Sequence, residues 1–158
     1  MSFLTGRTHY CHALRPENAG QTVKLSGWAN AIRDMGGVLF VDVRDRYGLT
    51  QIVFEPGITP EAALKEGARL KPESSLTVEG VVRLRSNPNS HIPTGMVEVV
   101  AGKVQAHNIP ASLPFEVAGD KDITQETRMR WRFLDLRRSK IKDRLPFRHA
   151  VIRAIREH

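Results

Sequence analysis

The alternation of apolar and polar side chains predicts five β-strands between residues 22 and 106. Successive side chains of a strand point to opposite faces, so an apolar residue at every second position marks a half-buried strand. The stretches that alternate in this way are 22–32, 38–45, 50–54, 74–85 and 96–106. Between the third and the fourth, ITPEAALKEGARL repeats its apolar residues at helical spacing, which predicts a helix with Thr59 as N-cap and Pro60 at its first position.

Three strands, a helix and two further strands form the order of elements in an OB-fold. We therefore predict an all-β OB-fold, a five-stranded Greek-key barrel with a helix between strands three and four, followed by a helical C-terminal extension. Barrels of this kind commonly bind single-stranded nucleic acid on the face of strands two and three.

Local signals refine this prediction. Gly27 interrupts the first strand and indicates a bulge or bend. If Tyr47-Gly48 is a two-residue hairpin loop, Gly48 adopts a positive φ and Arg44 lies opposite Gln51. In strand four, the alternation places four side chains in the core: Leu76, Val78, Val82 and Leu84.

The second strand places an aromatic side chain on its polar face. Phe40 shares that face with Asp42 and Arg44. A phenylalanine in this position can stack on an unpaired base. It can equally pack under a loop or against another domain, and on the pattern alone this packing role is the more common one.

Length and composition indicate a globular protein in a reducing compartment. The chain of 158 residues is long enough for one core and an extension. Its one cysteine, Cys11, allows no intrachain disulfide. We find no apolar run of membrane-spanning length and no signal or transit peptide at the N-terminus. We therefore predict a cytoplasmic protein that does not bind a membrane.

The net charge of +7 is typical of nucleic-acid-binding proteins, but it is unevenly distributed. Residues 1–120 contain 12 basic and 12 acidic side chains, whereas residues 121–158 contain 12 basic and 5 acidic ones. The predicted barrel therefore carries no excess charge, and if it binds nucleic acid, it must do so through local contacts. The C-terminal arginines can contact a nucleic-acid backbone or face a neighbouring domain.

The chain contains no recognisable catalytic or metal-binding motif. No nucleophile–base pair and no phosphate-binding loop is visible. His9, Cys11 and His12 lie close together, but no second cluster at ligand spacing accompanies them. We predict no catalytic residue, no metal site and no cofactor within these 158 residues.

Four stretches resemble the bacterial type of aspartyl-tRNA synthetase: RTHYC, GWANAIRDMGGVLFVDVRDRYGLTQIVF, TGMVEV and RWRFLDLRR. The resemblance covers nearly the whole chain in the same order. It implies an anticodon-binding barrel over residues 1–107, a linker and hinge region over 108–138, and the first helix of a truncated catalytic domain over 139–158. The helix ends in VIRAIREH without a stop signal, which favours truncation, and Pro146 indicates that it starts or kinks there.

The resemblance also implies which residues bind the anticodon of the tRNA. Phe40 matches the aromatic residue that stacks on the central uracil, and Gln51 matches the glutamine that hydrogen-bonds this base. Arg33 matches an arginine in the loop after strand one, and Glu98 matches a glutamate near the first anticodon base. The remaining two positions, in the region of strand four and the loop after it, are Arg85 and Asn89.

The function implied is recognition of a GUC anticodon by part of an aspartate–tRNA ligase, which joins aspartate to tRNA with ATP and magnesium. The parent enzyme is expected to be a homodimer. The chain itself is expected to be inactive and monomeric, with exposed Val151, Ile152 and Ile155. Met35 matches neither the leucine of tRNA(Asp)-specific relatives nor the histidine of relaxed ones. The alternative is a free-standing OB-fold protein that binds single-stranded nucleic acid without catalytic activity.

Overall fold

The computed structural model describes residues 6–119 and 121–158 of the chain. The chain divides into two compact units, Met1–Ala111 and Ser112–His158. The division expected from the sequence, with boundaries after residues 107 and 138, stays a prediction.

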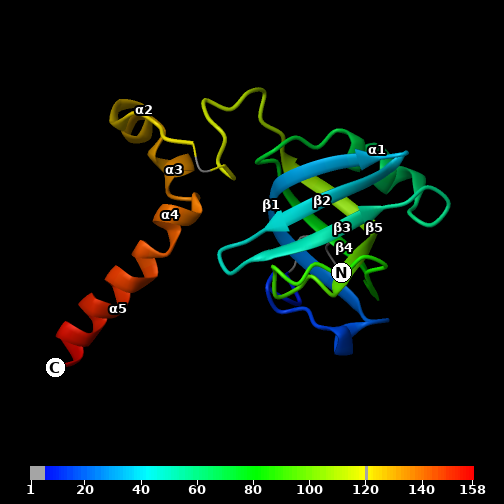
Figure 1. Cartoon of the computed structure of the whole chain (residues 1–158), viewed down its shortest axis with the longest axis horizontal. Helices are drawn as coiled ribbons and strands as arrows, with labels where there is room; N and C mark the ends of the chain where they lie inside the picture. Colours follow the sequence, from blue (N-terminus) through cyan, green and yellow to red (C-terminus); the bar gives the residue numbers. More distant parts are fainter. Residues whose placement is uncertain (1–5, 120) are drawn as a thin grey trace. The chain divides into compact units, whose positions relative to one another are not determined.

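The first unit contains a closed barrel of five strands (Figure 1). The strands are β1 (Thr22–Met35), β2 (Val38–Arg44), β3 (Leu49–Phe54), β4 (Ser75–Leu84) and β5 (Val97–Asn108). Their order around the barrel is β1-β2-β3-β5-β4, and β4 pairs with β1 to close it. All neighbours are antiparallel except β3 and β5, which pair in parallel. This is the predicted number and order of strands, with helix α1 between β3 and β4.

The barrel core contains the apolar positions that the alternation assigned to it, with one exception. Leu76, Val78 and Val82 of β4 are buried, but Leu84 is 57% exposed. Leu84 is the last residue of β4, and the prediction that it faces the core was wrong. The other strands contribute a cluster of buried side chains: Val23, Leu25, Ala29, Val41, Val43, Ile52, Phe54, Val97, Val99 and Ala101.

The turn between β2 and β3 is longer than predicted. Arg44 pairs with Leu49, and Gln51 lies opposite Asp42. The loop therefore holds the four residues 45–48, and Gly48 does not adopt the predicted positive φ. The register differs from the expected one by two residues, which keeps every side chain on its predicted face because the pleat has a period of two.

Asp45 shapes this turn and anchors the N-terminal segment. One carboxylate oxygen accepts from the backbone N–H of Tyr47 (2.7 Å) and of Gly48 (3.0 Å), and the other accepts from Cys11 N–H (2.8 Å). A Cβ on Gly48 would lie 2.7 Å from the Cβ of His12, so close packing against this segment explains the glycine. Burial raises the pKa of the Cys11 thiol, which keeps it protonated.

Strand β1 is longer than predicted, and its irregularity lies elsewhere. The pairing with β2 shifts register between Ala29 and Ala31, so the bulge is not at Gly27. A Cβ on Gly27 would lie 2.3 Å from the carbonyl oxygen of Arg44, which explains the glycine by close approach of the neighbouring backbone. Because β1 continues to Met35, Arg33 lies within a strand opposite Phe40 and not in a loop.

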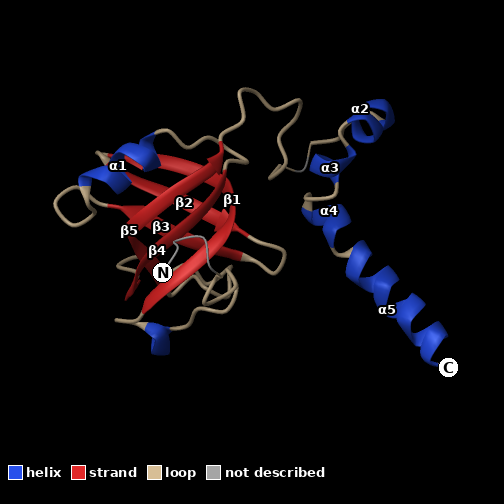
Figure 2. Cartoon of the chain, turned by 180° about the vertical axis from the view of Figure 1, so that it is seen from behind, coloured by secondary structure: helices blue, strands red, loops and turns tan. Residues whose placement is uncertain are grey.

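Helix α1 (Glu61–Ala68) begins later than predicted. Pro60 occupies the N-cap position, and the hydroxyl of Thr59 accepts from Glu55 N–H at 3.0 Å without capping the helix. On the inner side of α1, a Cβ on Gly67 would lie 2.6 Å from the ring of Phe54. Glycine at this position therefore allows the helix to approach the barrel (Figure 2).

The second unit is helical. Its helices are α2 (Gln125–Arg130), α3 (Arg132–Asp135), α4 (Ser139–Lys142) and α5 (Arg144–Glu157). Pro146 lies in the first turn of α5, where a missing backbone N–H costs no helical hydrogen bond. No helix of the described residues is long and apolar enough to cross a membrane.

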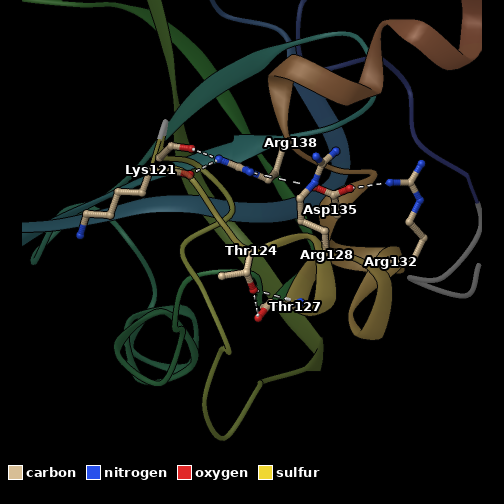
Figure 3. Close-up of polar contacts among 8 residues, drawn as sticks. Lys121, Thr124, Thr127, Arg128, Arg132, Asp135 and Arg138 are labelled. Atoms are coloured by element: carbon tan, nitrogen blue, oxygen red, sulfur yellow. Dashed lines mark hydrogen bonds and ion pairs between the residues drawn. The ribbon is translucent and has the colours of Figure 1, made fainter.

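A buried carboxylate organises the start of this unit (Figure 3). Asp135 is fully buried and accepts from Arg132 at 2.6 Å and from Arg128 at 3.2 Å. Arg138 lies 4.0 Å from the same carboxylate and donates to the carbonyl oxygen of Lys121 at 2.6 Å. Asp135 therefore ties α2, α3 and the preceding chain together, with three arginines around one negative charge.

Candidate nucleic-acid interface

A cavity of about 370 Å³ opens on the outer face of the barrel and is lined by every residue that the sequence assigned to base recognition. Strands β1, β2, β3 and β5 supply one wall, and the loop between β4 and β5 supplies the other. The predicted residues that line it are Arg33, Phe40, Gln51, Arg85, Asn89 and Glu98. Residues more than 60 positions apart in the chain thus meet at one place.

Phe40 lies on the side of β2 that faces away from the core. It is half-buried, lines the cavity and is absent from the core cluster that contains Val41 and Val43. Its cross-strand neighbour on β1 is Arg33. The position allows one face of the ring to receive a planar group that enters the cavity, because such a group would displace only solvent.

Five polar side chains form a row across the outer face, one from each strand. In the spatial order β4, β5, β3, β2, β1, this polar row consists of Arg83, Glu98, Gln51, Asp42 and Arg33. Every neighbouring pair except Gln51 and Asp42 is joined by at least one hydrogen bond of 2.8–2.9 Å. Within the row, acidic side chains alternate with basic or amide ones, so each donor meets an acceptor.

Arg33 and Asp42 form a two-pronged ion pair at one end of the row. The two Nη atoms of Arg33 donate to the two carboxylate oxygens at 2.8 and 2.9 Å. These hydrogen bonds raise the pKa of Arg33, although burial acts in the opposite direction. The pair holds the guanidinium plane still, so one Nη2 hydrogen also reaches the amide oxygen of Gln51 at 3.3 Å.

Gln51, in the centre of the row, is only 5% exposed and uses both ends of its amide. Its oxygen accepts from Arg85 at 2.9 Å and, at the longer distance, from Arg33. Its nitrogen donates to Glu98 at 2.8 Å. An amide offers two acceptor sites and two donor hydrogens, so one N–H of Gln51 remains for a ligand.

At the other end of the row, Arg83 lies between two carboxylates. Its Nε donates to Glu98 at 2.8 Å, and its Nη1 lies 2.8 Å from Glu55. Burial lowers the pKa of Arg83, but the hydrogen bonds to these two carboxylates outweigh this and raise it. Glu98 is therefore held by Arg83 on one oxygen and by Gln51 on the other.

The loop between β4 and β5 is folded against itself. Asn89 donates its backbone N–H to Gly95 O at 2.9 Å, and its side-chain oxygen accepts from His91 N–H at 3.0 Å. A Cβ on Gly95 would lie 1.6 Å from the carbonyl oxygen of Asn89, so this closure requires glycine. Thr94 ties the loop to the barrel by donating to Leu49 O at 2.6 Å. The side-chain oxygen of Asn89 is therefore engaged within the loop, while the residue lines the cavity.

The sequence did not assign Asp42, Arg83 or Glu55 to the site. Asp42 was placed on the outer face with Phe40, but the predicted hairpin register put Arg44 opposite Gln51, where the structure has Asp42. With the longer turn, Asp42 becomes the neighbour of Gln51. The alternation of charge along the outer faces of neighbouring strands was the signal in the sequence that could have assigned these residues to the site.

The residues described contain no group of three or more His, Cys, Asp or Glu side chains that could hold a metal ion. The carboxylates of the cavity, Asp42 and Glu98, are each bound to arginine. With both carboxylates held by arginine, the cavity does not fit a magnesium–ATP complex.

Residues 23–106, more than half of the chain, match the tRNA anti-codon family, described as an OB-fold nucleic acid binding domain. The chain belongs to this family. The OB-fold predicted from the order of elements is thereby confirmed, and the cavity lies on the face of β2 and β3 that such barrels commonly use.

Similarity to known proteins extends over nearly the whole chain. The chain is 46% identical over 153 residues to the aspartate–tRNA(Asp/Asn) ligase of Gluconobacter oxydans and 42% identical over 154 residues to that of Rubrobacter xylanophilus. Each match covers 96% of this chain but only 25% of the relative, so the chain spans about a quarter of their length. The resemblance to aspartyl-tRNA synthetases is confirmed.

Solved structures agree with this. Asparaginyl-tRNA synthetase of Pyrococcus horikoshii, complexed with asparaginyl-adenylate, has a TM-score of 0.81 and 26% identity, covering 98% of this chain and 34% of that one. An aspartyl-tRNA synthetase from Leishmania major has a TM-score of 0.68 over 84% of this chain and 29% of that one; at 23% identity, it supports the fold alone.

Proposed function

We propose that this chain is the anticodon-binding part of an aspartate–tRNA ligase and that its cavity reads the GUC anticodon of aspartate tRNA. The observation that carries the proposal is the gathering of Phe40, Gln51, Glu98 and two arginines around one cavity on the nucleic-acid-binding face of an OB-fold. A stacking surface, an amide and charged hydrogen-bonding groups are what recognition of an unpaired base requires.

The role of each residue is the one that the resemblance to aspartyl-tRNA synthetases implies, and the chemistry of each group suits that role. Phe40 stacks on the central uracil, and Gln51 pairs with its edge, donating with Nε2 and accepting with Oε1. When the base binds, it replaces the longest of the hydrogen bonds of Gln51, the one of 3.3 Å from Arg33 to Oε1 of Gln51. Glu98 accepts from the N1–H and amino group of the first base, guanine, with lone pairs that Arg83 and Gln51 leave free. Arg85 and Asn89 line the same pocket.

For the whole protein we propose aspartate–tRNA ligase activity that uses ATP and magnesium, in a cytoplasmic homodimer. The residues described here supply tRNA recognition and not the chemical step. The names of the Gluconobacter oxydans and Rubrobacter xylanophilus ligases specify both tRNA(Asp) and tRNA(Asn). These tRNAs share the first two anticodon bases, which are the ones that the cavity residues are proposed to read, so we propose that both bind.

The alternative is a free-standing protein that binds single-stranded nucleic acid without reading its sequence. The polar row does not favour it, because side chains that are held by hydrogen bonds around the buried Gln51 and Glu98 can discriminate between base edges, whereas unspecific binding needs only stacking and positive charge. The six charged side chains Arg33, Arg83, Arg85, Asp42, Glu55 and Glu98 are balanced three to three.

Titration of the chain with anticodon stem-loops tests the proposal. We expect a loop that reads GUC to bind more tightly than one that reads GCC, and a loop that reads GUU to bind nearly as well as GUC. Phe40→Ala should weaken binding of the GUC loop by about 1–3 kcal/mol, the value of one stacked base.

Phe133→Ala is the matched control, because Phe133 is 56% exposed and lies in the C-terminal unit. It should leave binding of the stem-loop unchanged. Equal affinity for all three loops, or an equal loss in both variants, would contradict the proposed function and support the unspecific binder.

A further inference from the structure

The amide of Gln51 has one orientation that its surroundings allow. Arg85 and Arg33 present only donor groups to Oε1, at 2.9 and 3.3 Å. Glu98 presents a carboxylate oxygen to Nε2 at 2.8 Å. A rotation of the amide by 180° would turn its N–H groups toward two guanidinium groups and its oxygen toward a carboxylate. Because guanidinium groups only donate and carboxylates only accept, the flipped amide would lose all three hydrogen bonds.

The orientation of this amide decides which pyrimidine it can pair with. Uracil presents an N3–H donor beside a carbonyl acceptor, and cytosine presents an N3 acceptor beside an amino donor. An amide that rotates freely satisfies either edge by exchanging its oxygen and nitrogen. An amide held in one orientation satisfies only one of them. Discrimination therefore depends on the groups that prevent rotation as much as on Gln51.

Arg83 holds the acceptor side of this arrangement in place. Its Nε donates to Glu98 Oε1 at 2.8 Å, while Gln51 uses the other oxygen, so Arg83 and Gln51 lie on opposite ends of one carboxylate. Arg83 is itself anchored by Glu55 at 2.8 Å. Arg83 and Glu55 are absent from the lining of the cavity, so neither has a base to contact there.

We propose that Arg83, anchored by Glu55, is a positioning residue that fixes Glu98 and thereby locks the Gln51 amide in the orientation that accepts uracil and rejects cytosine. The inference rests on the proposed function, because it explains how the proposed reading of the central base becomes specific. It adds two residues that act through Glu98 and do not touch the RNA.

The test compares the affinity ratio for stem-loops with uracil and with cytosine at the central anticodon position, measured by titration with the chain and its variants. Arg83→Met keeps an apolar stem but removes the guanidinium group, and with it the hydrogen bond to Glu98 and the ion pair with Glu55. We expect the ratio to fall by about fivefold, the factor for one net hydrogen bond, mainly through a gain in affinity for the cytosine loop. Arg83→Lys keeps one donor for Glu98 and should restore most of the lost ratio.

Glu98→Gln is the second variant and guards against failure of Arg83→Met to fold. It is isosteric, but its amide can present a donor or an acceptor to Gln51, so the ratio should fall again. Arg69→Met is the matched control: Arg69 is an exposed arginine of the same unit, paired with Glu66 outside the cavity. It should leave the ratio unchanged. A thermal melt of each variant verifies that it is folded.

The outcomes separate the two proposals. If the wild-type chain prefers uracil but folded Arg83→Met and Glu98→Gln retain its ratio, or lose affinity for both loops equally, the locking role is wrong while the proposed function stands. If the wild-type chain shows no preference for uracil, the proposed reading of the anticodon is wrong, and the locking role falls with it.

Discussion

The barrel and the C-terminal unit both pair carboxylates with arginines, but in different proportions. In the polar row of the barrel, Arg33 pairs with Asp42, and Arg83 bridges Glu98 and Glu55. In the C-terminal unit, one carboxylate, Asp135, lies within 4.0 Å of three arginines. The barrel side chains neutralise one another, whereas the C-terminal unit keeps a surplus of positive charge. Figure 3 shows the arginines around Asp135 in that unit.

The two charge distributions suit two different modes of RNA binding. A neutral surface with fixed donors and acceptors attracts a polyanion weakly but distinguishes the edges of bases. A surplus of arginine attracts any polyanion and distinguishes little. The sequence shows the same division, since the whole net charge of +7 arises from residues 121–158. We therefore propose that specificity is concentrated in the barrel and unspecific attraction in the C-terminal unit.

We expect the largest effect, a loss in the free energy of unfolding, from a substitution in the apolar core of the barrel. Comparing it with a substitution on the outer face tests which of the two stabilises the barrel. Phe54 is fully buried against Gly67, so Phe54→Ala should lower the free energy of unfolding by about 3–5 kcal/mol. Phe40→Ala removes the same ring from the half-buried outer face and should cost far less. Chemical denaturation followed by the signal of the barrel measures both. Similar losses in the two variants would mean that Phe40 belongs to the core.

A smaller effect is expected when the buried carboxylate of the other unit is made neutral. Asp135→Asn leaves three arginines around an uncharged amide and should destabilise the C-terminal unit by about 2–3 kcal/mol. The expected loss lies below that of a fully buried ion pair because the Arg128 and Arg132 side chains are 35% and 47% exposed.

Thermal loss of helical circular dichroism measures this change, and the ratio of affinities for the GUC and GCC stem-loops is the control that should not change. A variant that lowers this ratio while keeping its helices would show that the two units do not act separately.

The smallest effect concerns pH and should be confined to the barrel. Burial raises the pKa of the Cys11 thiol above its value in the unfolded chain, about 8.5. The stability that Cys11 contributes is therefore complete below that pH and is lost as the pH rises above it. Between about pH 8 and about pH 10, the wild-type barrel should lose about 2 kcal/mol more than Cys11→Ala. Parallel pH profiles for the two proteins would contradict this assignment.

Much of the fold and of the site was determined by local pattern. The period of two placed Val41, Val43 and Ile52 in the core and left Phe40 and Gln51 outside it. These assignments depend only on whether residues are an even or an odd number of positions apart. For this reason they survived an error of two residues in the β2–β3 register. The helix between the third and fourth strands needed only its apolar spacing.

Positions where the backbones of two elements come close could not be read from the pattern. A bulge was expected at Gly27 and a positive φ at Gly48, since glycine permits both. In the structure, each glycine makes room for another segment, the Arg44 carbonyl in one case and His12 in the other. The same holds at Gly95, where the fold of the β4–β5 loop leaves no room for a side chain. A glycine in a sequence does not reveal which neighbour it faces.

The sequence by itself determined the strands, their faces, the family and the six residues that meet at the cavity. Only the tertiary structure decided how these residues are connected. Gln51 meets Glu98, 47 residues further along the chain, because β3 pairs in parallel with β5, and Arg83 joins them because β4 lies on the far side of β5. Hydrogen bonds form only between side chains that strand register brings opposite one another, and register across distant strands is set by closure of the whole barrel.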